Sequence, residues 1–285
     1  MARFHTRSMM AAVLAVALSG SLSACGGTSQ SSDGDGKRIT IGIKFDQPGL
    51  GFKQGSSYTG LDTDVARYVA KKLGYSEDQI VWKEAPSKQR EALIQNGDVD
   101  MVVATYTMNK ARSKVIDFAG PYFVAAQDLL VRSDETGITG PKSLDGKKLC
   151  SVTGSNSAQR IKQDYSNKVQ LMEQSGYAEC VTALISGTVD AVTTDDVILA
   201  GLASAKGNGQ LKVLGTPFSK EPYGIGIKKG DTSMVSKVNK AIEDMISDGS
   251  WKKAVDSATK GTWYTPNSEF NPPTKIGDSS WIQDL

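Results

Sequence analysis

The sequence predicts an α/β protein whose sheets are mostly parallel. Short runs rich in β-branched residues alternate with helical patterns along the chain of 285 residues, and this alternation is typical of strands joined by helices. Two segments, Leu93–Val102 and Leu184–Val192, each show an apolar helix end, a glycine and then an aspartate before a β-rich run. A glycine can close a helix in the left-handed conformation, so each segment predicts one helix-to-strand unit. The similarity allows either a duplicated lobe or a common connection used twice.

The individual elements follow from residue periodicity. Apolar and β-branched runs predict strands, and apolar residues spaced three or four apart predict helices. The predicted strands are Ile39–Ile43, Met101–Thr105, Leu129–Val131, Leu149–Val152, Val189–Thr193, Leu211–Leu214 and Gly224–Ile227. The predicted helices are Asp62–Leu73, Ser87–Asn96, Ser157–Asp164, Glu179–Ile185, Val197–Leu202 and Thr232–Ser247. Asp62 is expected to cap the first of these helices.

Residues 1–24 carry the features of a secretory signal peptide. Arg3 and Arg7 give a positive start, and the apolar stretch 9–22 is too short to span a bilayer. Small residues precede Cys25 in the run Leu-Ser-Ala-Cys, which resembles the lipobox of bacterial lipoproteins. The resemblance implies cleavage before Cys25, lipidation of its thiol and an extracytoplasmic domain anchored to the cell membrane. An ordinary signal peptide followed by a chance cysteine is the alternative.

A flexible tether is predicted at residues 25–37. Residues 26–36 are all Gly, Ser, Thr, Gln or Asp, and this composition has too little apolar surface to offset the entropy of ordering. Charge is balanced beyond the signal peptide, because the chain has 33 Lys and Arg against 31 Asp and Glu, and two of the basic residues are Arg3 and Arg7. Without a basic stripe, no nucleic-acid partner is expected.

Few residues in the chain can carry chemistry. The single histidine, His5, lies in the signal peptide, which excludes Ser-His and Cys-His catalysis and His-containing metal sites from the mature chain. We therefore expect no metal and no cofactor. Cys150 and Cys180 remain, and a pair of cysteines in an oxidising location predicts a disulfide. Two separate buried thiols are the alternative.

Two stretches resemble a known family. Residues 60–73, GLDTDVARYVAKKL, are similar to the signature of the family 3 solute-binding proteins, the polar amino-acid receptors of ABC importers. Residues 105–122, which begin TYTMNKAR, resemble the second characteristic stretch of that family. The resemblance extends over about Arg38–Thr259 and is greatest to glutamate-binding lipoproteins of Gram-positive bacteria. It implies a two-lobed, periplasmic-binding-protein-like fold with a ligand cleft and a hinge between the lobes.

The resemblance also implies how the chain is divided. Residues 38–130 and 218–265 are expected to form the first lobe, and residues 131–217 the second. Chain crossings near Val131-Arg132 and Gly215-Thr216-Pro217 are expected to act as the hinge. Residues 266–285 are expected to form an irregular C-terminal tail.

Arg112, Thr105 and Thr107 are the first-lobe candidates for binding an α-amino acid. Such a ligand carries a carboxylate and an ammonium group, so its site needs a cationic donor, hydroxyl or amide donors and a carboxylate. Arg112 matches the family's α-carboxylate arginine, whose guanidinium can bind two oxygens; a solvent-facing salt bridge is the alternative. The two threonines, two apart on a strand, are expected to point to one side, although β propensity alone would also explain them.

Two second-lobe features complete the candidate site. Ser155 and Asn156 lie in a loop between a predicted strand and helix, where unpaired backbone N–H groups favour an anion. The loop could be merely a helix cap, but the resemblance implies contact with the ligand carboxylate. Asp195 stands at the family's ammonium-binding position and is preferred over its neighbour Asp196.

Lys44 and Arg90 are the candidates for specificity. Lys44 follows the first strand, and Arg90 aligns with a family position that faces the ligand side chain. Two cations there favour an acidic side chain and disfavour a basic one; two exposed basic residues are the alternative. The segment Pro48–Phe52 departs from the family's usual Pro-Phe pair, so Phe52 is only one candidate for the aromatic residue that covers the ligand.

The resemblance implies a monomeric receptor that captures L-glutamate or L-aspartate by hinge closure. A ligand that contacts both lobes stabilises the closed form, which the permease and ATPase subunits of an ABC importer can then recognise. One alternative is an enzyme similar to the cyclohexadienyl dehydratases that share this fold, although no residue stands out as its acid. A sensor without transport activity is a further alternative.

Overall fold

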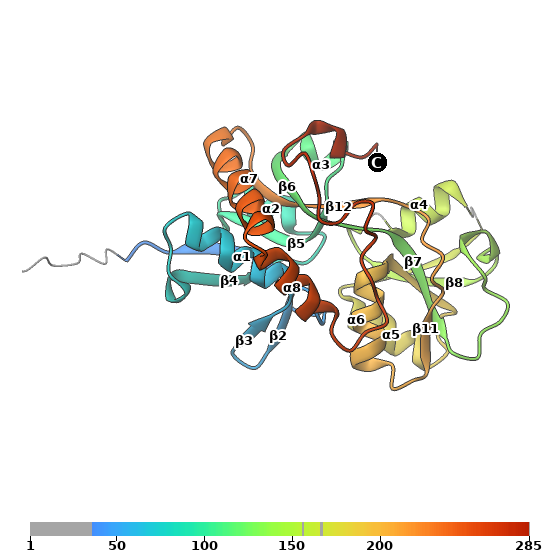
Figure 1. Cartoon of the computed structure of the whole chain (residues 1–285). Helices are drawn as coiled ribbons and strands as arrows, with labels where there is room; N and C mark the ends of the chain where they lie inside the picture. The colour runs from blue at the N-terminus through green and yellow to red at the C-terminus, as the bar shows by residue number, and fades with distance from the viewer. Residues whose placement is uncertain (1–35, 156, 166–167, 285) are drawn as a thin grey trace, which may run out of the picture. The chain divides into compact units, whose positions relative to one another are not determined.

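The computed structural model describes residues 36–155, 157–165 and 168–284. The predicted signal peptide, Cys25, most of the predicted tether and Asn156 lie outside the described residues. The described chain contains two five-stranded sheets and a two-stranded hairpin (Figure 1). No helix in this part of the chain combines the length and apolarity that a membrane crossing requires.

The strands are β1 (Ile39–Ile43), β2 (Phe52–Gln54), β3 (Ser57–Thr59), β4 (Ile80–Glu84), β5 (Met101–Thr107), β6 (Ile116–Ala125), β7 (Gln127–Arg132), β8 (Lys148–Val152), β9 (Gln170–Gln174), β10 (Ala191–Asp195), β11 (Leu211–Val213) and β12 (Glu221–Lys228). The α-helices are α1 (Leu61–Lys72), α2 (Arg90–Gln95), α3 (Lys110–Ser113), α4 (Ser157–Asp164), α5 (Tyr177–Ile185), α6 (Asp196–Lys206), α7 (Thr232–Ser247) and α8 (Ser250–Thr259). Short 3₁₀ helices are η1 (Glu77–Gln79), η2 (Pro141–Ser143) and η3 (Ser279–Trp281).

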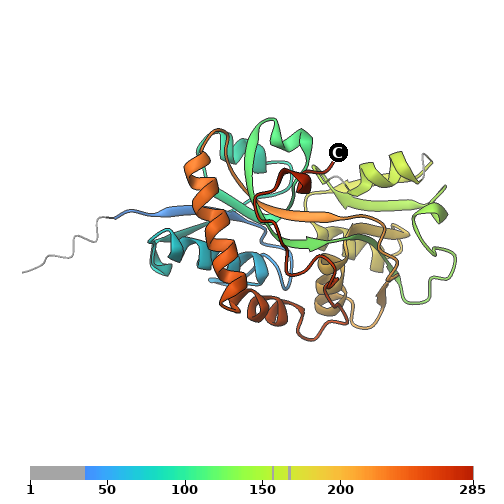
Figure 2. The ribbon, with the colours of Figure 1, turned by 45° about the horizontal axis from the view of Figure 1, so that its top comes forward.

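The first sheet has the strand order β4-β1-β5-β12-β6. β4, β1 and β5 are parallel, and β12 lies antiparallel between β5 and β6, so four of the five strands run in one direction. Helix α7 lies against β6 and contacts α1, as both views of the ribbon show (Figures 1 and 2). Three aromatic residues, Tyr122, Phe123 and Tyr223, are fully buried in the core of this lobe.

The second sheet has the order β11-β7-β10-β8-β9. β10, β8 and β9 are parallel, and β7 lies antiparallel between β11 and β10, so again four of five strands share one direction. Each sheet therefore contains a single reversed strand, and each reversed strand borders one of the two passages of the chain between the sheets. The predicted α/β class with mostly parallel sheets is confirmed.

The chain passes between the sheets at two places. β6 ends at Ala125 and β7 begins at Gln127, so the first crossing is at Ala126 and not near Val131-Arg132. Residues 127–130, expected in the first lobe, pair in the second sheet because β7 bonds to both β10 and β11. Residues 214–220 form the second crossing and include the expected Gly215-Thr216-Pro217. The other lobe limits, and the hinge motion itself, stay predictions.

Helix α1 shows one departure from expectation. α4 and α7 have the predicted bounds, whereas α1 begins at Leu61 and its N-cap is Gly60, so Asp62 does not cap it. The Asp62 carboxylate instead accepts hydrogen bonds from the Tyr122 hydroxyl at 2.6 Å and from the Thr105 N–H at 3.1 Å. Those two buried donors draw the side chain into the core.

The longer strands that the sequence did not predict are β4, β6 and β9. All three are edge strands. The residues of β4 and β9 are only partly buried, as expected for strands with one neighbour. β6 is mostly buried but contains Gly120-Pro121, a pair that usually interrupts a strand but is tolerated at an edge. The β2–β3 hairpin and helix α8 were missed as well.

The two similar sequence segments form the same hydrogen-bonded unit. In the first lobe, Asp100 N donates to Thr40 O at 2.8 Å, and Thr40 N donates to Asp100 Oδ2 at 2.7 Å. In the second lobe, Asp190 N donates to Lys148 O and Lys148 N donates to Asp190 Oδ2, both at 2.8 Å. Because both the backbone and the carboxylate bonds recur, the structure favours a duplicated lobe over a chance connection.

The C-terminal tail, expected to be irregular, packs along edge strand β6. The Asn271 side chain accepts from Val124 N at 3.0 Å and donates to Val124 O at 2.8 Å. Gly277 N donates to Gly120 O at 2.7 Å. The tail thus occupies backbone groups of an edge strand that would otherwise need other partners.

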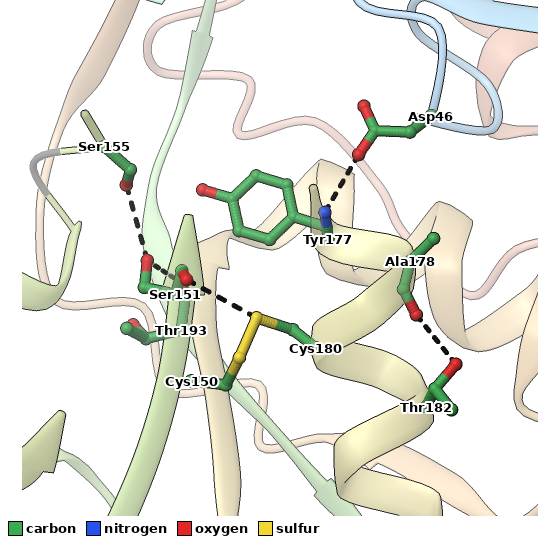
Figure 3. The surroundings of a disulfide bond; sticks show 9 residues. All are labelled: Asp46, Cys150, Ser151, Ser155, Tyr177, Ala178, Cys180, Thr182 and Thr193. Carbon is green, nitrogen blue, oxygen red and sulfur yellow. Dashed lines mark hydrogen bonds between the residues drawn. A yellow bond between two sulfur atoms is a disulfide. The ribbon is translucent and has the colours of Figure 1, made fainter. Parts of the chain in front are cut away.

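Cys150 on β8 and Cys180 on α5 form the predicted disulfide, which holds the helix against the strand (Figure 3). The two cysteines are 30 residues apart in sequence. The bond therefore removes conformational freedom from a sizeable loop of the unfolded chain.

We expect Cys150→Ala/Cys180→Ala to lower the free energy of unfolding by about 3 kcal/mol, because the unfolded chain regains the entropy of that loop. Urea unfolding followed by circular dichroism, with and without dithiothreitol, measures the difference. Reduction should destabilise the wild type and leave the double variant unchanged. Equal stability of the oxidised wild type and the double variant would contradict the prediction.

Candidate ligand-binding site

A small polar cavity of about 30 Å³ lies between the two sheets. The first-lobe elements contribute Gln47, Ser87, Arg90, Thr105, Thr107, Arg112 and Glu221, and the second-lobe elements contribute Ser155, Ser157, Tyr177, Thr194, Asp195 and Ile198. Six of the predicted binding residues lie in this lining: Arg90, Thr105, Thr107, Arg112, Ser155 and Asp195. The volume is enough for about two water molecules.

Arg112 is buried and is held by both lobes. It lies in α3, where Asn109 Oδ1 accepts from the Arg112 N–H at 2.8 Å. Its guanidinium donates to Thr107 O at 2.7 Å and to Gly154 O of the second lobe at 3.4 Å, and Nε lies 3.4 Å from Glu91 Oε1. Burial, and then the charge of Arg90, lower the pKa of Arg112 to about 10. Arg112 is therefore a charged donor at neutral pH and is not a solvent-facing salt bridge.

Arg90 is the first residue of α2, and only 3% of it is exposed. Nη1 donates to Ala104 O at 3.0 Å, and the guanidinium carbon lies 4.0 Å from the centre of the Tyr106 ring. Nε has no hydrogen-bond partner, and no carboxylate oxygen within the described residues forms an ion pair with Arg90. Arg90 is thus a buried cation whose charge is only partly compensated.

Lys44 follows β1 and is also 3% exposed. It does not line the cavity, but its Nζ donates to the Oγ of Ser87, which does, at 3.4 Å. Burial lowers the pKa of Lys44, and the Asp46 carboxylate, 4.0 Å away, opposes that shift. Lys44 therefore reaches the cavity through the Ser87 hydroxyl.

Thr105 and Thr107 line the cavity from a bulged part of β5. Thr105 has a φ of 45°, a left-handed value that is strained for a β-branched residue, and the register with β12 shifts at this point. The bulge turns the Thr105 N–H away from the neighbouring strand, and this N–H donates a hydrogen bond to the Asp62 carboxylate. Asp62 thereby supports the conformation of the cavity wall.

The Ser155 loop already satisfies some of its own N–H groups. Ser155 N donates to Val152 O at 2.9 Å and Ser157 N donates to Ser155 Oγ at 3.1 Å, so the expectation of unpaired groups was wrong at these two positions, because the loop closes on itself. Gly154 has a φ of 81°, and a Cβ there would lie 2.7 Å from the backbone of Lys88 in the first lobe. Only glycine allows this close approach of the two lobes.

Asp195, and not Asp196, lines the cavity. Asp195 Oδ2 accepts from the Tyr223 hydroxyl at 2.6 Å. Burial, and then the charge of Glu221, raise the pKa of Asp195 well above its usual range. Asp196 Oδ1 instead accepts from Ala126 N at 3.2 Å, at the first crossing.

Phe52 does not line the cavity, so the structure gives no support to its covering a ligand. It begins the β2–β3 hairpin, where it pairs with Thr59 and bridges to Asp46, and this pairing holds it outside the lining. Tyr177 is the aromatic residue in the cavity lining among the described residues.

Seven lining residues were not predicted from the sequence: Gln47, Ser87, Ser157, Tyr177, Thr194, Ile198 and Glu221. Glu221 is 4% exposed and pairs with Arg160 at 2.9 Å. Glu221 is the first residue of β12, and a charged residue at the start of an otherwise apolar strand was the available sequence signal. Ser157 and Thr194 lie next to predicted residues of the site, whereas Gln47, Ser87, Tyr177 and Ile198 come from separate loops and helix ends that only the folded chain brings together.

A larger groove, of about 590 Å³, lies on the first lobe between α1, η1 and α8. Its charged residues are half-buried or exposed, whereas Arg90, Arg112 and Asp195 are at least nine-tenths buried. Buried ionisable groups that converge from several elements are the better indication of a ligand site.

A family model for the bacterial extracellular solute-binding proteins, family 3, matches residues 39–259. The chain belongs to this family. Glutamate-binding protein GluB of Corynebacterium efficiens is 45% identical over 267 residues, which cover 88% of this chain and 90% of that protein. The ABC transporter glutamine-binding protein GlnH of Bacillus subtilis is 40% identical, over 75% of this chain and 78% of that protein.

A solved structure, an ancestral arginine-binding protein bound to glutamine, is 33% identical to this chain with a TM-score of 0.72. The matched region covers 77% of this chain and 96% of the chain in that structure. This similarity confirms the expected two-lobed fold. The three relatives bear the names of binding proteins and not of enzymes.

The buried carboxyl of Asp62 should make stability depend on pH. Burial raises its pKa to about 7, despite the hydrogen bonds from Tyr122 and Thr105, whereas an unfolded chain has an Asp pKa of about 3.9. Between about pH 4 and pH 7 the folded state therefore binds more protons than the unfolded state, and the free energy of unfolding falls as pH rises.

We expect Asp62→Asn to flatten this slope by up to about 1.4 kcal/mol per pH unit, the contribution of one proton. Urea unfolding at several pH values between about 4.5 and 7 measures the slope. Asp98→Asn is the control, because Asp98 is an exposed carboxylate paired with Lys83. A slope that is identical in Asp62→Asn and the wild type would rule out the titration of Asp62 in this range.

Proposed function

We propose that this protein is the lipid-anchored, extracytoplasmic receptor of an ABC importer for an acidic amino acid, L-glutamate or L-aspartate. Its family supports the role of a solute receptor, and the similarity to GluB supports glutamate as the first ligand to test. The proposed receptor passes its ligand to the permease after the lobes close around it.

The observation that carries the acidic specificity is the buried guanidinium of Arg90. Its Nε has no partner, and its charge has no carboxylate partner among the described residues. A buried charge is costly unless it is paired and hydrogen-bonded. Lys44, which lies 4.0 Å from the Asp46 carboxylate, contacts the same wall through Ser87. A ligand carboxylate would compensate the charge of Arg90.

The remaining polar groups fit the two charged groups of an α-amino acid. Arg112 supplies a planar guanidinium for the α-carboxylate, with the hydroxyls of Thr107 and Ser155 in the same lining. Asp195 supplies a carboxylate for the ammonium group. Binding of that ammonium would favour the ionised form of Asp195, which burial alone disfavours.

Capture requires the lobes to separate and close again. Both lobes contribute to the lining, and the cavity of about 30 Å³ is smaller than an amino acid, so a ligand cannot enter without movement of its walls. A ligand that contacts both lobes stabilises the closed form by its difference in affinity for the two forms. The crossings at Ala126 and residues 214–220 are the proposed hinge.

Glutamine is the main competing ligand, because GlnH is named as glutamine-binding. Its side-chain amide can accept a hydrogen bond from Arg90 but brings no charge. The buried charge of Arg90, which has no carboxylate partner among the described residues, would then stay uncompensated, so we expect glutamate to bind more tightly than glutamine.

Calorimetric titration of the full-length protein with glutamate, aspartate, glutamine, asparagine, arginine and prephenate tests the proposal. We expect glutamate to bind with a Kd of about 1 µM or lower. Arg112→Ala should weaken it about 100-fold, because the charged hydrogen bonds to the α-carboxylate are lost. Arg90→Gln should remove the preference for glutamate over glutamine. Arg67→Gln, which changes an arginine that pairs with Glu77 on the surface of α1, is the control.

Two results would count against this reading. Tighter wild-type binding of glutamine or arginine than of glutamate would remove the acidic specificity and leave the receptor role intact. Turnover of prephenate without binding of any amino acid would indicate the enzyme alternative.

The proposed anchor is tested separately at Cys25. We expect Cys25→Ala to abolish labelling by radioactive palmitate and to release the protein into the culture medium, because the chain then lacks its lipid. Glutamate uptake by those cells should fall, since a released receptor is diluted away from the permease. Retention of the variant in the membrane fraction would contradict lipid anchoring, and unchanged uptake after deletion of the whole gene would contradict a transport role.

A further inference from the structure

Helix α5 of the second lobe begins without a cap of its own. Its N-cap residue is Gly176, which has no side chain to accept a hydrogen bond from the first turn. The first N–H groups of a helix need acceptors, and Ser, Thr, Asp or Asn usually supplies one at the N-cap position. The helix has nine residues and carries two features already described, the disulfide at Cys180 and the cavity residue Tyr177 at its first position.

The missing acceptor comes from the first lobe. Asp46, in the loop after β1, accepts the backbone N–H of Tyr177 on Oδ2 at 2.9 Å, across 131 positions in sequence. Figure 3 shows this carboxylate directed at the start of α5, on the side of Tyr177 away from Ser155. A negative charge at a helix N-terminus is also favoured by the helix dipole.

Gly176 leaves the space that the carboxylate needs. A Cβ at position 176 would lie 2.6 Å from Asp46 Oδ2 and 2.8 Å from Glu179 Oε2. The backbone of Gly176 is extended, with φ −142° and ψ 166°, a conformation open to any residue. The glycine is therefore explained by the approach of Asp46 and not by the backbone.

The same carboxylate also faces the candidate specificity residue. Asp46 Oδ1 lies 4.0 Å from Lys44 Nζ. Glu84 and Glu179 line the same crevice of about 330 Å³, so Asp46 has one cation and two carboxylates around it. The contact to Tyr177 joins the loop that positions Lys44 to the helix that positions Tyr177.

We propose that Asp46 is an inter-lobe positioning residue, a latch that supplies the N-terminal cap of α5 only while the lobes are closed. The proposal rests on the closure described under the proposed function. Separation of the lobes would leave the first turn of α5 without its acceptor, so the latch stabilises the closed form without touching the ligand. Asp46→Ala should then accelerate ligand release more than it slows ligand association.

Two measurements test the latch in the full-length protein. The first is the distance distribution, without ligand, between spin labels at Lys240→Cys on α7 and Thr182→Cys on α5, both exposed positions. Asp46→Ala should shift the distribution to longer distances. The second is the rate of glutamate release by stopped-flow fluorescence, which should rise about fivefold, the factor that corresponds to the loss of a typical helix cap from the closed form. An unchanged distance distribution would overturn the proposal even if no amino acid tested binds to the wild type.

Asp231→Ala is the matched control. Asp231 caps α7 through Met234 N at 2.9 Å, entirely within the first lobe. This variant should lose thermal stability and keep the wild-type distances and release rate. A shift of equal size in Asp231→Ala would mean that the loss of any helix cap lengthens the distance between the two labels, and it would overturn the proposal of a latch.

Two further variants separate the latch from a purely local role. Asp46→Ala/Gly176→Ser gives α5 its own cap and completes a capping box with Glu179, so thermal stability should recover while the longer distances persist. Recovery of the wild-type distances would show that Asp46 serves only the helix.

Asp46→Asn keeps an acceptor oxygen and removes the charge opposite Lys44, so it should resemble the wild type. If Asp46→Asn instead behaved like Asp46→Ala, the loss of the Asp46–Lys44 ion pair would explain the effect, and the proposed latch would be overturned.

Discussion

The buried carboxylate of Asp62 is the interaction on which the candidate site depends. It belongs to α1, yet it accepts hydrogen bonds from the Tyr122 hydroxyl of β6 and from the Thr105 N–H of β5. The second bond holds Thr105 at a positive φ that a β-branched residue rarely adopts. Without that acceptor the bulge in β5 would leave a buried N–H unpaired, and the cavity wall would lose its shape.

A second tyrosine–carboxylate bond of the same kind extends this core into the other lobe. The Tyr223 hydroxyl donates to Asp195 at 2.6 Å, and the ring of Tyr223 lies 6.0 Å from that of Tyr122. The two tyrosines therefore orient two carboxylates: Tyr122 orients Asp62, which lies behind the cavity in the first lobe, and Tyr223 orients Asp195 in the cavity wall of the second lobe. The buried guanidinium groups of Arg90 and Arg112 lie in the first-lobe part of the lining, so the cationic and the acidic groups of the cavity are held at fixed positions in the two lobes.

The candidate site was partly predictable because the family motifs are local. Arg112 and Thr107 lie in one short stretch, and Asp195 follows a recognisable helix-to-strand unit, so each could be assigned from its neighbours in sequence. Phe52 failed as a cavity residue because a hairpin holds it outside the lining. Tyr177 was missed because nothing beside it in the sequence reveals that it lines the same cavity as Arg112.

The sequence by itself determined the α/β class, the bounds of α4 and α7, the cysteine pair and the membership of a receptor family. These features depend on periodicity, end signals and short motifs, which act over a few residues. Only the tertiary structure decided that the edge strands form, that Asp62 supports β5 instead of capping α1, and that Asp46 closes a helix of the other lobe. Each of those depends on a hydrogen-bond partner at least 22 positions away in the chain, and local sequence carries no record of such a partner.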